Sequence, residues 1–345
     1  MVKNNVVSVV VCFVALSLAT SAVDGELVNA VYVFGDSLVD VGNNDYLPAP
    51  APRATPPYAQ RLGFEMSPKP FLSMGRPERT LLGRCKIGAN FASGGSGILD
   101  TTGNGTLTMR TQIKYFKRVA DKLFCYPSKW DHLARSFFLL SGGGNDFWAF
   151  NASVDTPNAY IARMVSTYIE NIQMLYDAGS RMVGILDVPP IGCTPGSRAG
   201  TPTGDCNSAA NSLAQGFNSL LRTELASAAA TNMTGLKYSI AGNYNIISDM
   251  IANSLVAGLR EVQTACCGAG RFKAEVMCSG PNTTACPAGE HGEYMFWDML
   301  HPTQATCERG AVAIFYGDVP KYAEPVNFAT LVGEEGCSLQ MADDK

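Results

Sequence analysis

The fold of this chain is decided by residues 31–40, Val31-Tyr-Val-Phe-Gly-Asp-Ser-Leu-Val-Asp40. An apolar run of β-branched and aromatic residues stops abruptly at Gly35-Asp36-Ser37, which predicts a buried strand that carries a hydroxyl to the edge of a sheet. A serine can act as the nucleophile of acyl transfer when a histidine and a carboxylate stand beside it. A Gly-Asp-Ser turn after a strand is more often a helix cap, so Ser37 needs partners elsewhere in the chain.

One of the three histidines has a carboxylate at a useful spacing. Asp298 precedes His301 by three residues, and Pro302 follows directly. A residue before proline is disfavoured in helical geometry, and proline suits the first position of a helix. We therefore expect a helix from Pro302 to about Tyr316, with His301 at its mouth as the candidate general base. The alternative is that Asp298 only caps that helix.

The other two histidines are weaker candidates for a catalytic base. His132 follows Trp130 and Asp131 in a helical or capping context, which favours a structural role. His291 lies in a Gly-Glu-His-Gly loop, where we expect it to be exposed.

Strands alternate with helices along the rest of the chain. The patterns predict further strands over 137–140, 181–188 and 236–241, and helices over 109–123, 157–177, 206–230 and 302–316. The strands end in Gly, Pro, Asn or Asp, which is typical of an α/β fold with a mainly parallel sheet. Eight of the nineteen prolines fall between Pro48 and Pro77 and forbid regular structure over most of that region. No repeat or linker divides the chain, which predicts one domain.

Two glycine-rich turns are expected on the same rim of the sheet as Ser37. They are Gly94–Gly97 and Gly142–Asn145. Ligands of parallel α/β sheets bind outside the carboxyl ends of the strands. No Lys-Ser/Thr follows either turn, so neither is a P-loop. Backbone N–H groups and the Asn145 amide could stabilise a developing oxyanion, although tight packing between strand and helix explains the glycines equally well.

Composition and the N-terminus predict an exported protein. Charged residues make up 16% of the 345, below the average of about 25%, and the net charge of −4 leaves no basic surface for nucleic acid. Lys3, an apolar run over residues 6–19 and the small residues before Val23 form a signal peptide over residues 1–22, cut after Ala22. The run is too short for a membrane span. The mature chain would be residues 23–345.

The cysteines and the glycosylation sequons fit export. Removal of Cys12 with the signal peptide leaves ten of the eleven cysteines, which predicts disulfides. Cys193 with Cys206 and links within residues 266–286 are the most local pairs; the pairing is otherwise open. Zinc binding by cysteines 266, 267, 278 and 286 is the competing interpretation, but their spacing matches no usual finger. Candidate glycosylation sites are Asn104, Asn151, Asn232 and Asn282.

Six blocks of sequence together suggest a family. No serine lies in the G-x-S-x-G elbow of the α/β-hydrolases, so a serine esterase here must use another scaffold. The blocks are residues 34–44 (Phe-Gly-Asp-Ser-Leu-Val-Asp-Val-Gly-Asn-Asn), 88–98, 143–147 (Gly-Gly-Asn-Asp-Phe), 189–193, 266–268 and 296–303 (Phe-Trp-Asp-Met-Leu-His-Pro-Thr). In this order they resemble the plant secreted branch of the GDSL esterase/lipase family, within the SGNH hydrolases.

The resemblance implies a role for each site residue. Ser37 would be the nucleophile, His301 the base and Asp298 its orienting partner. The Ser37 N–H, the Gly94 N–H and the Asn145 side chain would form the oxyanion hole, with Gly95 as the alternative glycine. The implied fold is a three-layer α/β/α sandwich, flavodoxin-like, with about five mainly parallel strands, and the implied chemistry needs no cofactor or metal.

The implied activity is hydrolysis of a carboxylic ester by a secreted enzyme, in the apoplast or cell wall if the source is a plant. The substrate would be a small-molecule or lipid-like ester; which ester, and the oligomeric state, stay open. Family members usually carry a Gly-Arg-Phe-Ser-Asn-Gly-Arg/Lys stretch and a helix between the first two blocks, which this chain lacks between Asn44 and Gly88. Acyl transfer through the same acyl-enzyme, or a binding protein impaired by that loss, are the alternatives.

Overall fold

The computed structural model describes residues 27–52, 68–125 and 127–333. The predicted signal peptide over residues 1–22 and the divergent stretch at residues 58–64 lie outside the described residues. Within the described ranges, no helix is both long enough and apolar enough to cross a bilayer.

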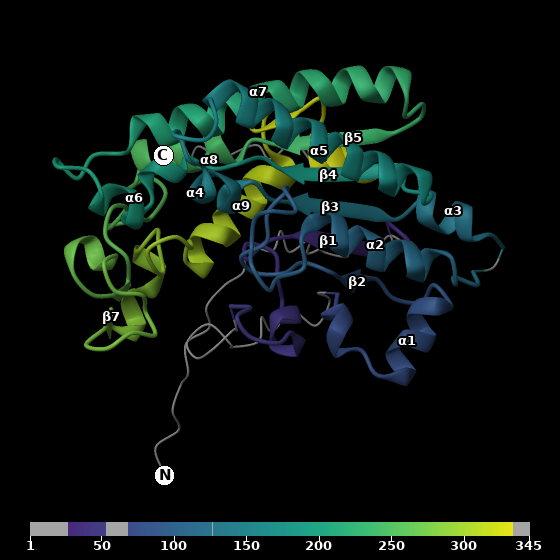
Figure 1. Ribbon diagram of the computed structural model, residues 1–345, viewed down its shortest axis with the longest axis horizontal. Coiled ribbons are helices and arrows are strands. Elements are labelled where there is room, and N and C mark those ends of the chain that lie inside the picture. Colours follow the sequence, from purple (N-terminus) through teal and green to yellow (C-terminus); the bar gives the residue numbers. More distant parts are fainter. Residues whose placement is uncertain (1–26, 53–67, 126, 334–345) are drawn as a thin grey trace, which may run out of the picture.

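A six-stranded sheet forms the centre of the molecule (Figure 1). Its strands, in spatial order, are β2 (Ala89–Asn90), β1 (Val31–Gly35), β3 (Phe137–Ser141), β4 (Met182–Leu186), β5 (Lys237–Ala241) and β8 (Ala323–Glu324). The first five are parallel, and β8 pairs antiparallel with β5. The prediction of a mainly parallel sheet is confirmed. β2 and β8 were not predicted, because two residues are too few to show a periodic pattern.

Helices cover both faces of this sheet, which confirms the three-layer sandwich. The helices are α1 (Arg76–Gly83), α2 (Met109–Ala120), α3 (Lys129–Ala134), α4 (Gly144–Ala149), α5 (Pro157–Asp177), α6 (Pro195–Ala199), α7 (Ser208–Thr231), α8 (Asn243–Ala252), α9 (Gln304–Tyr316) and α10 (Phe328–Val332). Successive side chains of a strand point to opposite faces. Tyr32 and Phe34 of β1 therefore belong to one core cluster with residues of α2, α5 and α7, whereas Val33 belongs to a second cluster with residues of α9 and α10.

Local sequence explains where the long helices begin. The side chains of Thr156 and Asn207 accept hydrogen bonds from the first turns of α5 and α7, as N-cap residues do. Helix α9 begins at Gln304, two residues later than predicted, because Thr303 is its N-cap. Helix α1 was not predicted, because it starts at the edge of the proline-dense stretch, where Pro77 is tolerated in the first turn.

The strand order places the predicted turns together. The chain moves from β1 outward to β2 and then returns to the other side of β1 as β3. Such a reversal is the topological switch point where α/β sheets bind ligands. Ser37 follows β1, the Gly94–Gly97 turn follows β2, and the Gly142–Asn145 turn follows β3. All three lie at the carboxyl ends of neighbouring parallel strands, as predicted.

Four disulfides between described cysteines link loops and helix ends. They are Cys85–Cys125, Cys193–Cys206, Cys266–Cys286 and Cys267–Cys278. The expectation of disulfides, including the local pair and the links within residues 266–286, is confirmed. Zinc binding by the last four cysteines is wrong, since their sulfurs bond to each other instead of offering thiolates.

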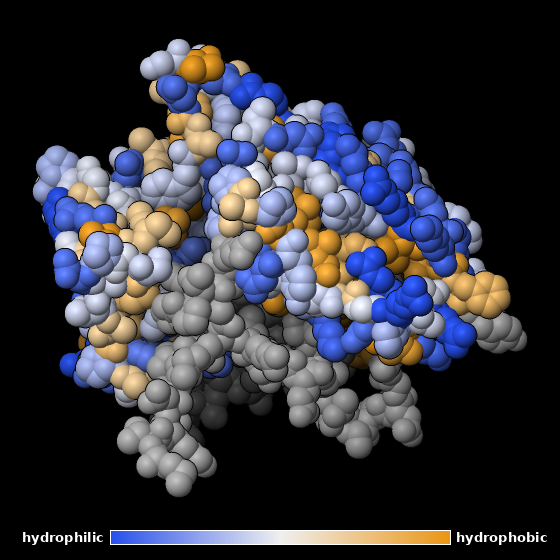
Figure 2. All heavy atoms as spheres, turned by 60° about the horizontal axis from the view of Figure 1, so that its bottom comes forward, coloured by the Kyte–Doolittle hydropathy of each residue, from blue (hydrophilic) through white to orange (hydrophobic). Residues whose placement is uncertain are grey.

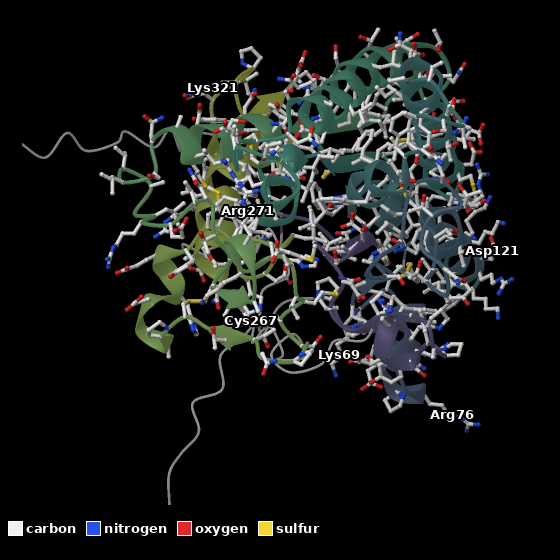
Figure 3. The ribbon with its side chains drawn as sticks, turned by 60° about the vertical axis from the view of Figure 1, so that its left-hand side comes forward. Lys69, Arg76, Asp121, Cys267, Arg271 and Lys321 are labelled. Carbon is white, nitrogen blue, oxygen red and sulfur yellow. A yellow bond between two sulfur atoms is a disulfide. The ribbon has the colours of Figure 1, made fainter. Side chains whose placement is uncertain are left out.

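The surface is mostly polar on the face shown in Figure 2, where hydrophobic side chains emerge in separate patches. Charged side chains point outward from the α1 and α2 side of the molecule, for example Arg76 and Asp121, while Cys267 lies in the loop-rich region across the structure (Figure 3). That region, residues 259–303, leads directly into α9.

Candidate active site

Ser37, His301 and Asp298 form a continuous chain of hydrogen bonds, although 264 residues separate the first two. His301 Nε2 lies 2.8 Å from Ser37 Oγ. His301 Nδ1 lies 2.8 Å and 3.0 Å from the two oxygens of Asp298. The fold thus brings a hydroxyl, an imidazole and a carboxylate into the order that nucleophilic acyl transfer requires.

The electrostatics of this chain favour a basic histidine. Burial alone would lower the pKa of His301, but the charge and hydrogen bond of Asp298, with a smaller contribution from Asp36, raise it above its ordinary value. Burial would likewise raise the pKa of Asp298, yet the adjacent His301 and the hydrogen bonds that it receives hold it below the ordinary range. Asp36 is buried, and burial raises its pKa to about 6.

Asp298 does not cap helix α9. Its Oδ1 accepts hydrogen bonds from the backbone N–H groups of Leu300 (2.8 Å) and His301 (2.7 Å), which close a tight turn ahead of the helix. The Trp297 N–H donates to the carbonyl of His301 at 2.8 Å, so a backbone hydrogen bond also joins the two ends of this turn. The turn therefore sets the direction of both catalytic candidates.

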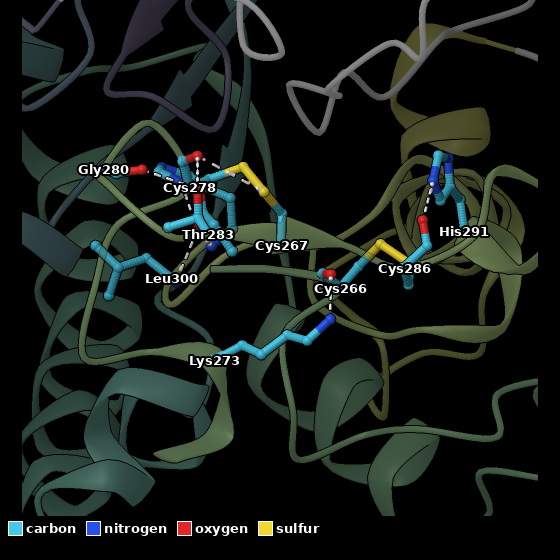
Figure 4. Close-up of a disulfide and its surroundings, with 11 residues drawn as sticks. Cys266, Cys267, Lys273, Cys278, Gly280, Thr283, Cys286, His291 and Leu300 are labelled. Atoms are coloured by element: carbon cyan, nitrogen blue, oxygen red, sulfur yellow. Dashed lines mark hydrogen bonds and ion pairs between the residues drawn. A yellow bond between two sulfur atoms is a disulfide. The ribbon is translucent and has the colours of Figure 1, made fainter. Parts of the chain in front are cut away.

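The cysteine-rich segment is hydrogen-bonded to the residues that lead into this turn. Cys266 and Cys267 donate their backbone N–H groups to the carbonyls of Phe296 (2.9 Å) and Trp297 (2.7 Å). Each of these adjacent cysteines belongs to a different disulfide (Figure 4). Trp297 belongs to the same buried cluster as the four cysteines of these disulfides. Two crosslinks therefore hold the strand-like segment against which the Asp298 turn is paired.

Gln112 fixes the strand end that carries Ser37. Its side chain accepts from the N–H of Gly35 at 2.8 Å and donates to the Gly35 carbonyl (2.8 Å) and to the Leu107 carbonyl (2.7 Å). Gln112 is fully buried, so these bonds form in a low dielectric. Gln112 was not predicted as a site residue; the signal for it was a glutamine beside Ile113 on the apolar side of the helix predicted over 109–123.

Asn145 and the Ser37 N–H offer donors beside the hydroxyl. Asn145 is the second residue of α4, and one N–H of its amide donates to the Ser96 carbonyl at 2.9 Å, which leaves its second N–H for a ligand. Among the described residues, the Ser37 N–H meets no acceptor within hydrogen-bond distance. Both groups are neutral donors of the kind that stabilises an oxyanion.

The two glycines considered for the third donor differ. Gly94 lies against Ser37, since a Cβ added to it would be 3.6 Å from the Ser37 Cβ. Its N–H, however, donates to Asp40 Oδ2 at 2.9 Å. The Gly95 N–H has no acceptor within the described part of the chain, and its φ of +81° suits glycine. Gly95 thus has the unpaired N–H among the described residues, whereas Gly94 is the glycine that lies against Ser37.

Asp146 joins the two glycine turns and was also missed. Its buried carboxylate accepts from the N–H groups of Ile98 (2.9 Å) and Leu99 (3.0 Å) and from the Thr102 hydroxyl (2.9 Å). Because Asp146 directly follows Asn145, these bonds fix the amide relative to the turn at residues 94–97.

An apolar cavity of about 120 Å³ opens beside the serine. Ser37, Asn145 and His301 line its mouth side, and buried side chains such as Val188 and Ile314 line its inner side. Most of its surface is apolar, as in sites that take a hydrophobic ligand and orient it with a few polar groups.

The remaining histidines lie away from this cavity. His132 is buried in α3, with its Nε2 3.5 Å from the Tyr32 hydroxyl, and burial lowers its pKa. His291 is half-buried and bonds the Cys286 carbonyl at 3.2 Å. The expectation of an exposed loop is wrong for His291, because its ring packs edge-on against Trp297.

Metal ligands do not gather at the site within the described residues. Two sets of side chains hold their candidate ligand atoms close together, Cys85, Cys125 and His132 in one and Cys266, Cys286 and His291 in the other. Each set contains a disulfide pair, which lacks the thiolate that binds a metal.

Comparison with known proteins shows similarity along most of the chain. The model of the GDSL-like lipase/acylhydrolase family matches residues 31–312. GDSL esterase/lipase APG of Arabidopsis thaliana is 32% identical over 326 residues, which cover 84% of this chain and 90% of that protein. GDSL esterase/lipase At5g55050 of the same plant is 30% identical over 344 residues, with 88% and 89% covered.

Solved structures show a more distant likeness. A catalytic mutant of Axe2, an acetylxylan esterase from Geobacillus stearothermophilus, aligns with a TM-score of 0.37 and 11% identity, over 89% of this chain and 94% of its own. Phospholipase A1 from Streptomyces albidoflavus aligns with a TM-score of 0.25 and 17% identity, over 58% and 76%.

Proposed function

The chain belongs to the GDSL-like lipase/acylhydrolase family and is a hydrolase of ester bonds. We propose that it is a secreted serine carboxylic-ester hydrolase with a Ser37–His301–Asp298 triad. The observation that carries the proposal is the hydrogen-bond chain from Ser37 Oγ through His301 to Asp298. The mature chain, residues 23–345, would form one domain, since the site joins its first strand to its last long helix.

The proposed reaction has two halves. His301 Nε2 takes the proton of Ser37 as Oγ attacks the ester carbonyl, and Asp298 stabilises the imidazolium that forms. The imidazolium then gives its proton to the leaving alcohol, which departs and leaves an acyl group on Ser37. Water enters, loses a proton to His301 and attacks the acyl carbonyl, which releases the acid and restores Ser37.

The oxyanion is stabilised by fixed donors in both halves. We assign this role to three donors: the Ser37 N–H, the second N–H of the Asn145 amide and the N–H of a glycine. Gly95 is the glycine whose N–H is available, because the N–H of Gly94 donates to Asp40. Such donors lower the barrier because they are already oriented when the charge develops.

Secretion and glycosylation are part of the proposal. Disulfides persist in oxidising, extracytoplasmic environments, and the structure holds four between described cysteines. The four sequon asparagines are all exposed (Asn104, Asn151, Asn232 and Asn282), as a glycan acceptor must be.

A fluorophosphonate probe tests the triad and the fold together, because it reacts only with an activated serine. We expect the wild-type protein to be labelled at Ser37 and to hydrolyse p-nitrophenyl acetate. Ser37→Ala should abolish labelling and lower kcat by about 10⁴-fold or more. Full esterase activity in Ser37→Ala would refute the assignment.

A further inference from the structure

Helix α9 closes the inner side of the cavity beside Ser37. Cys307, Gly310, Ala311 and Ile314 all line this cavity. Their spacing of three and four residues places them on one face of the helix. One wall of the cavity is therefore built by a single helix, and one position on it has no side chain.

That position, Gly310, is unusual for a helix interior. Glycine is among the poorest residues for helix stability, yet Gly310 lies in the middle of α9 (Gln304–Tyr316) and is buried. Among the described residues, and apart from the helix's own backbone, no atom lies within 4 Å of a Cβ added there. Because Gly310 itself lines the cavity, a larger side chain at this position would extend into it.

Close packing does not explain this glycine. In α7, a Cβ on Gly216 would lie 3.0 Å from Ile161 of the neighbouring helix, so glycine there permits two helices to approach each other. Within the part of the chain that the structure describes, no such neighbour lies beside Gly310. Gly310 is not among the glycines with a positive φ. Its backbone conformation therefore accepts any L-residue. The feature that depends on the missing side chain is therefore the volume of the cavity beside Ser37.

The inner cavity suits the acyl part of the ester better than the alcohol part. During turnover the alcohol must leave and water must replace it beside His301, so the alcohol needs the solvent side. The acyl group stays on Ser37 through both steps and can occupy the closed side. Buried apolar residues, among them Leu186, Val188 and Ile314, line that side.

We propose that Gly310 sets the depth of an acyl pocket in this enzyme, and that the pocket takes apolar acyl groups of short to medium length. An engineered apolar cavity of about 150 Å³ in another protein binds benzene, so the 120 Å³ found here corresponds to about five carbon atoms, the chain of a hexanoyl group beyond its carbonyl. The inference rests on the proposed function, because it presumes an acyl-enzyme on Ser37.

The test compares p-nitrophenyl hexanoate with p-nitrophenyl acetate in the wild type, Gly310→Ala and Gly310→Leu. Each buried methylene contributes roughly a fourfold preference. We expect the hexanoate-to-acetate ratio of kcat/KM to fall about fourfold in Gly310→Ala and at least tenfold in Gly310→Leu. The alanine variant decides the question if the leucine variant does not fold.

Gly83→Leu is the matched control. Gly83 is the last residue of α1 and is not among the residues that line the cavity. Among the described residues, no atom outside its own helix lies within 4 Å of a Cβ added there. Its ratio should equal that of the wild type. A series of acetates with longer alcohols tests the other side of the ester, and we expect no selective loss there in Gly310→Leu.

Two outcomes would overturn the inference alone. One is an unchanged hexanoate-to-acetate ratio in Gly310 variants that still react with the fluorophosphonate probe. The other is a loss confined to long alcohols. If instead the folded wild-type protein is neither labelled nor active on any ester, the proposed function itself is wrong and the inference fails with it.

Discussion

Asp298→Asn should disable the base while leaving the turn in place. Oδ1 of Asp298 accepts two backbone N–H groups, from Leu300 and His301, at 2.8 Å and 2.7 Å. An asparagine would keep its oxygen at that position, because its amide nitrogen cannot accept hydrogen bonds. The NH₂ group would then replace Oδ2 and face His301 Nδ1, which now lies 2.8 Å from that oxygen.

The consequence is the wrong tautomer of the base. Facing an NH₂ donor, Nδ1 must accept, so the proton of the neutral ring moves to Nε2. His301 then donates to Ser37 instead of accepting its proton. The corresponding change in a well-studied serine protease lowers kcat by about 10⁴-fold, and we expect a loss of about that size, equivalent to ~5.4 kcal/mol on the barrier.

The pH profile gives an independent readout. His301 acts as a base only when neutral, and Asp298 raises its pKa, so wild-type kcat/KM should fall as the pH drops through a value above the ordinary ~6.5. Without the carboxylate, burial lowers the pKa, and the same limb should move to lower pH. The assay is hydrolysis of p-nitrophenyl acetate between pH 4.5 and 9, with thermal unfolding followed in parallel.

Since the backbone bonds of the turn are kept, the melting temperature should shift by less than about 4 °C. Asp121→Asn, at the exposed C-terminal end of α2, is the control and should behave as the wild type. An Asp298→Asn enzyme within tenfold of wild-type activity, or with an unmoved acidic limb, would refute the assigned role of Asp298.

Two further changes test the support around the reacting atoms. Asn145→Ala should lower kcat about 10²–10³-fold with little change in KM, because the amide is assigned to the transition state; a loss confined to KM would contradict this. Replacing Cys266 and Cys286 by alanine should lower stability by about 2–4 kcal/mol and also lower kcat of the folded enzyme, since this bridge holds the segment paired with the Asp298 turn. Removal of the Cys85–Cys125 disulfide, which links the end of α1 to the loop after α2, should lower stability without lowering kcat. If both disulfide variants lose kcat equally, the specific role of Cys266–Cys286 in holding the Asp298 turn is refuted.

Most of the fold was predictable because its main elements are long and regular. The helix at residues 157–177 was predicted to the residue, since apolar side chains recur over nearly six turns and Pro157 and Gly179 stand at its ends. The strands before Ser37 and before Gly142 were predictable from runs that are buried on both faces. Short elements such as β8 carry no period and depend on pairing with β5.

The candidate site was predictable only as a set of residue types. Ser37, Asn145 and His301 stood out because each follows a strand or precedes a helix. Gln112 and Asp146 were missed, because their roles depend on hydrogen bonds to backbone groups far away in sequence. The hydrogen bond from the Gly94 N–H to Asp40 joins residues 54 positions apart and likewise could not be predicted from local sequence.

The alternation of strands and helices follows from the sequence, because apolar periodicity and turn residues are local properties. The same alternation predicts that Ser37 and the two glycine turns lie at the carboxyl edge of the parallel sheet. Only the packing of distant segments brings His301 Nε2 to 2.8 Å from Ser37 Oγ and places two disulfides beside the Asp298 turn. Packing likewise leaves Gly310 without a close neighbour among the described residues. These depend on how distant segments pack, and packing distances are set by the whole assembly of side chains rather than by any one stretch of the chain.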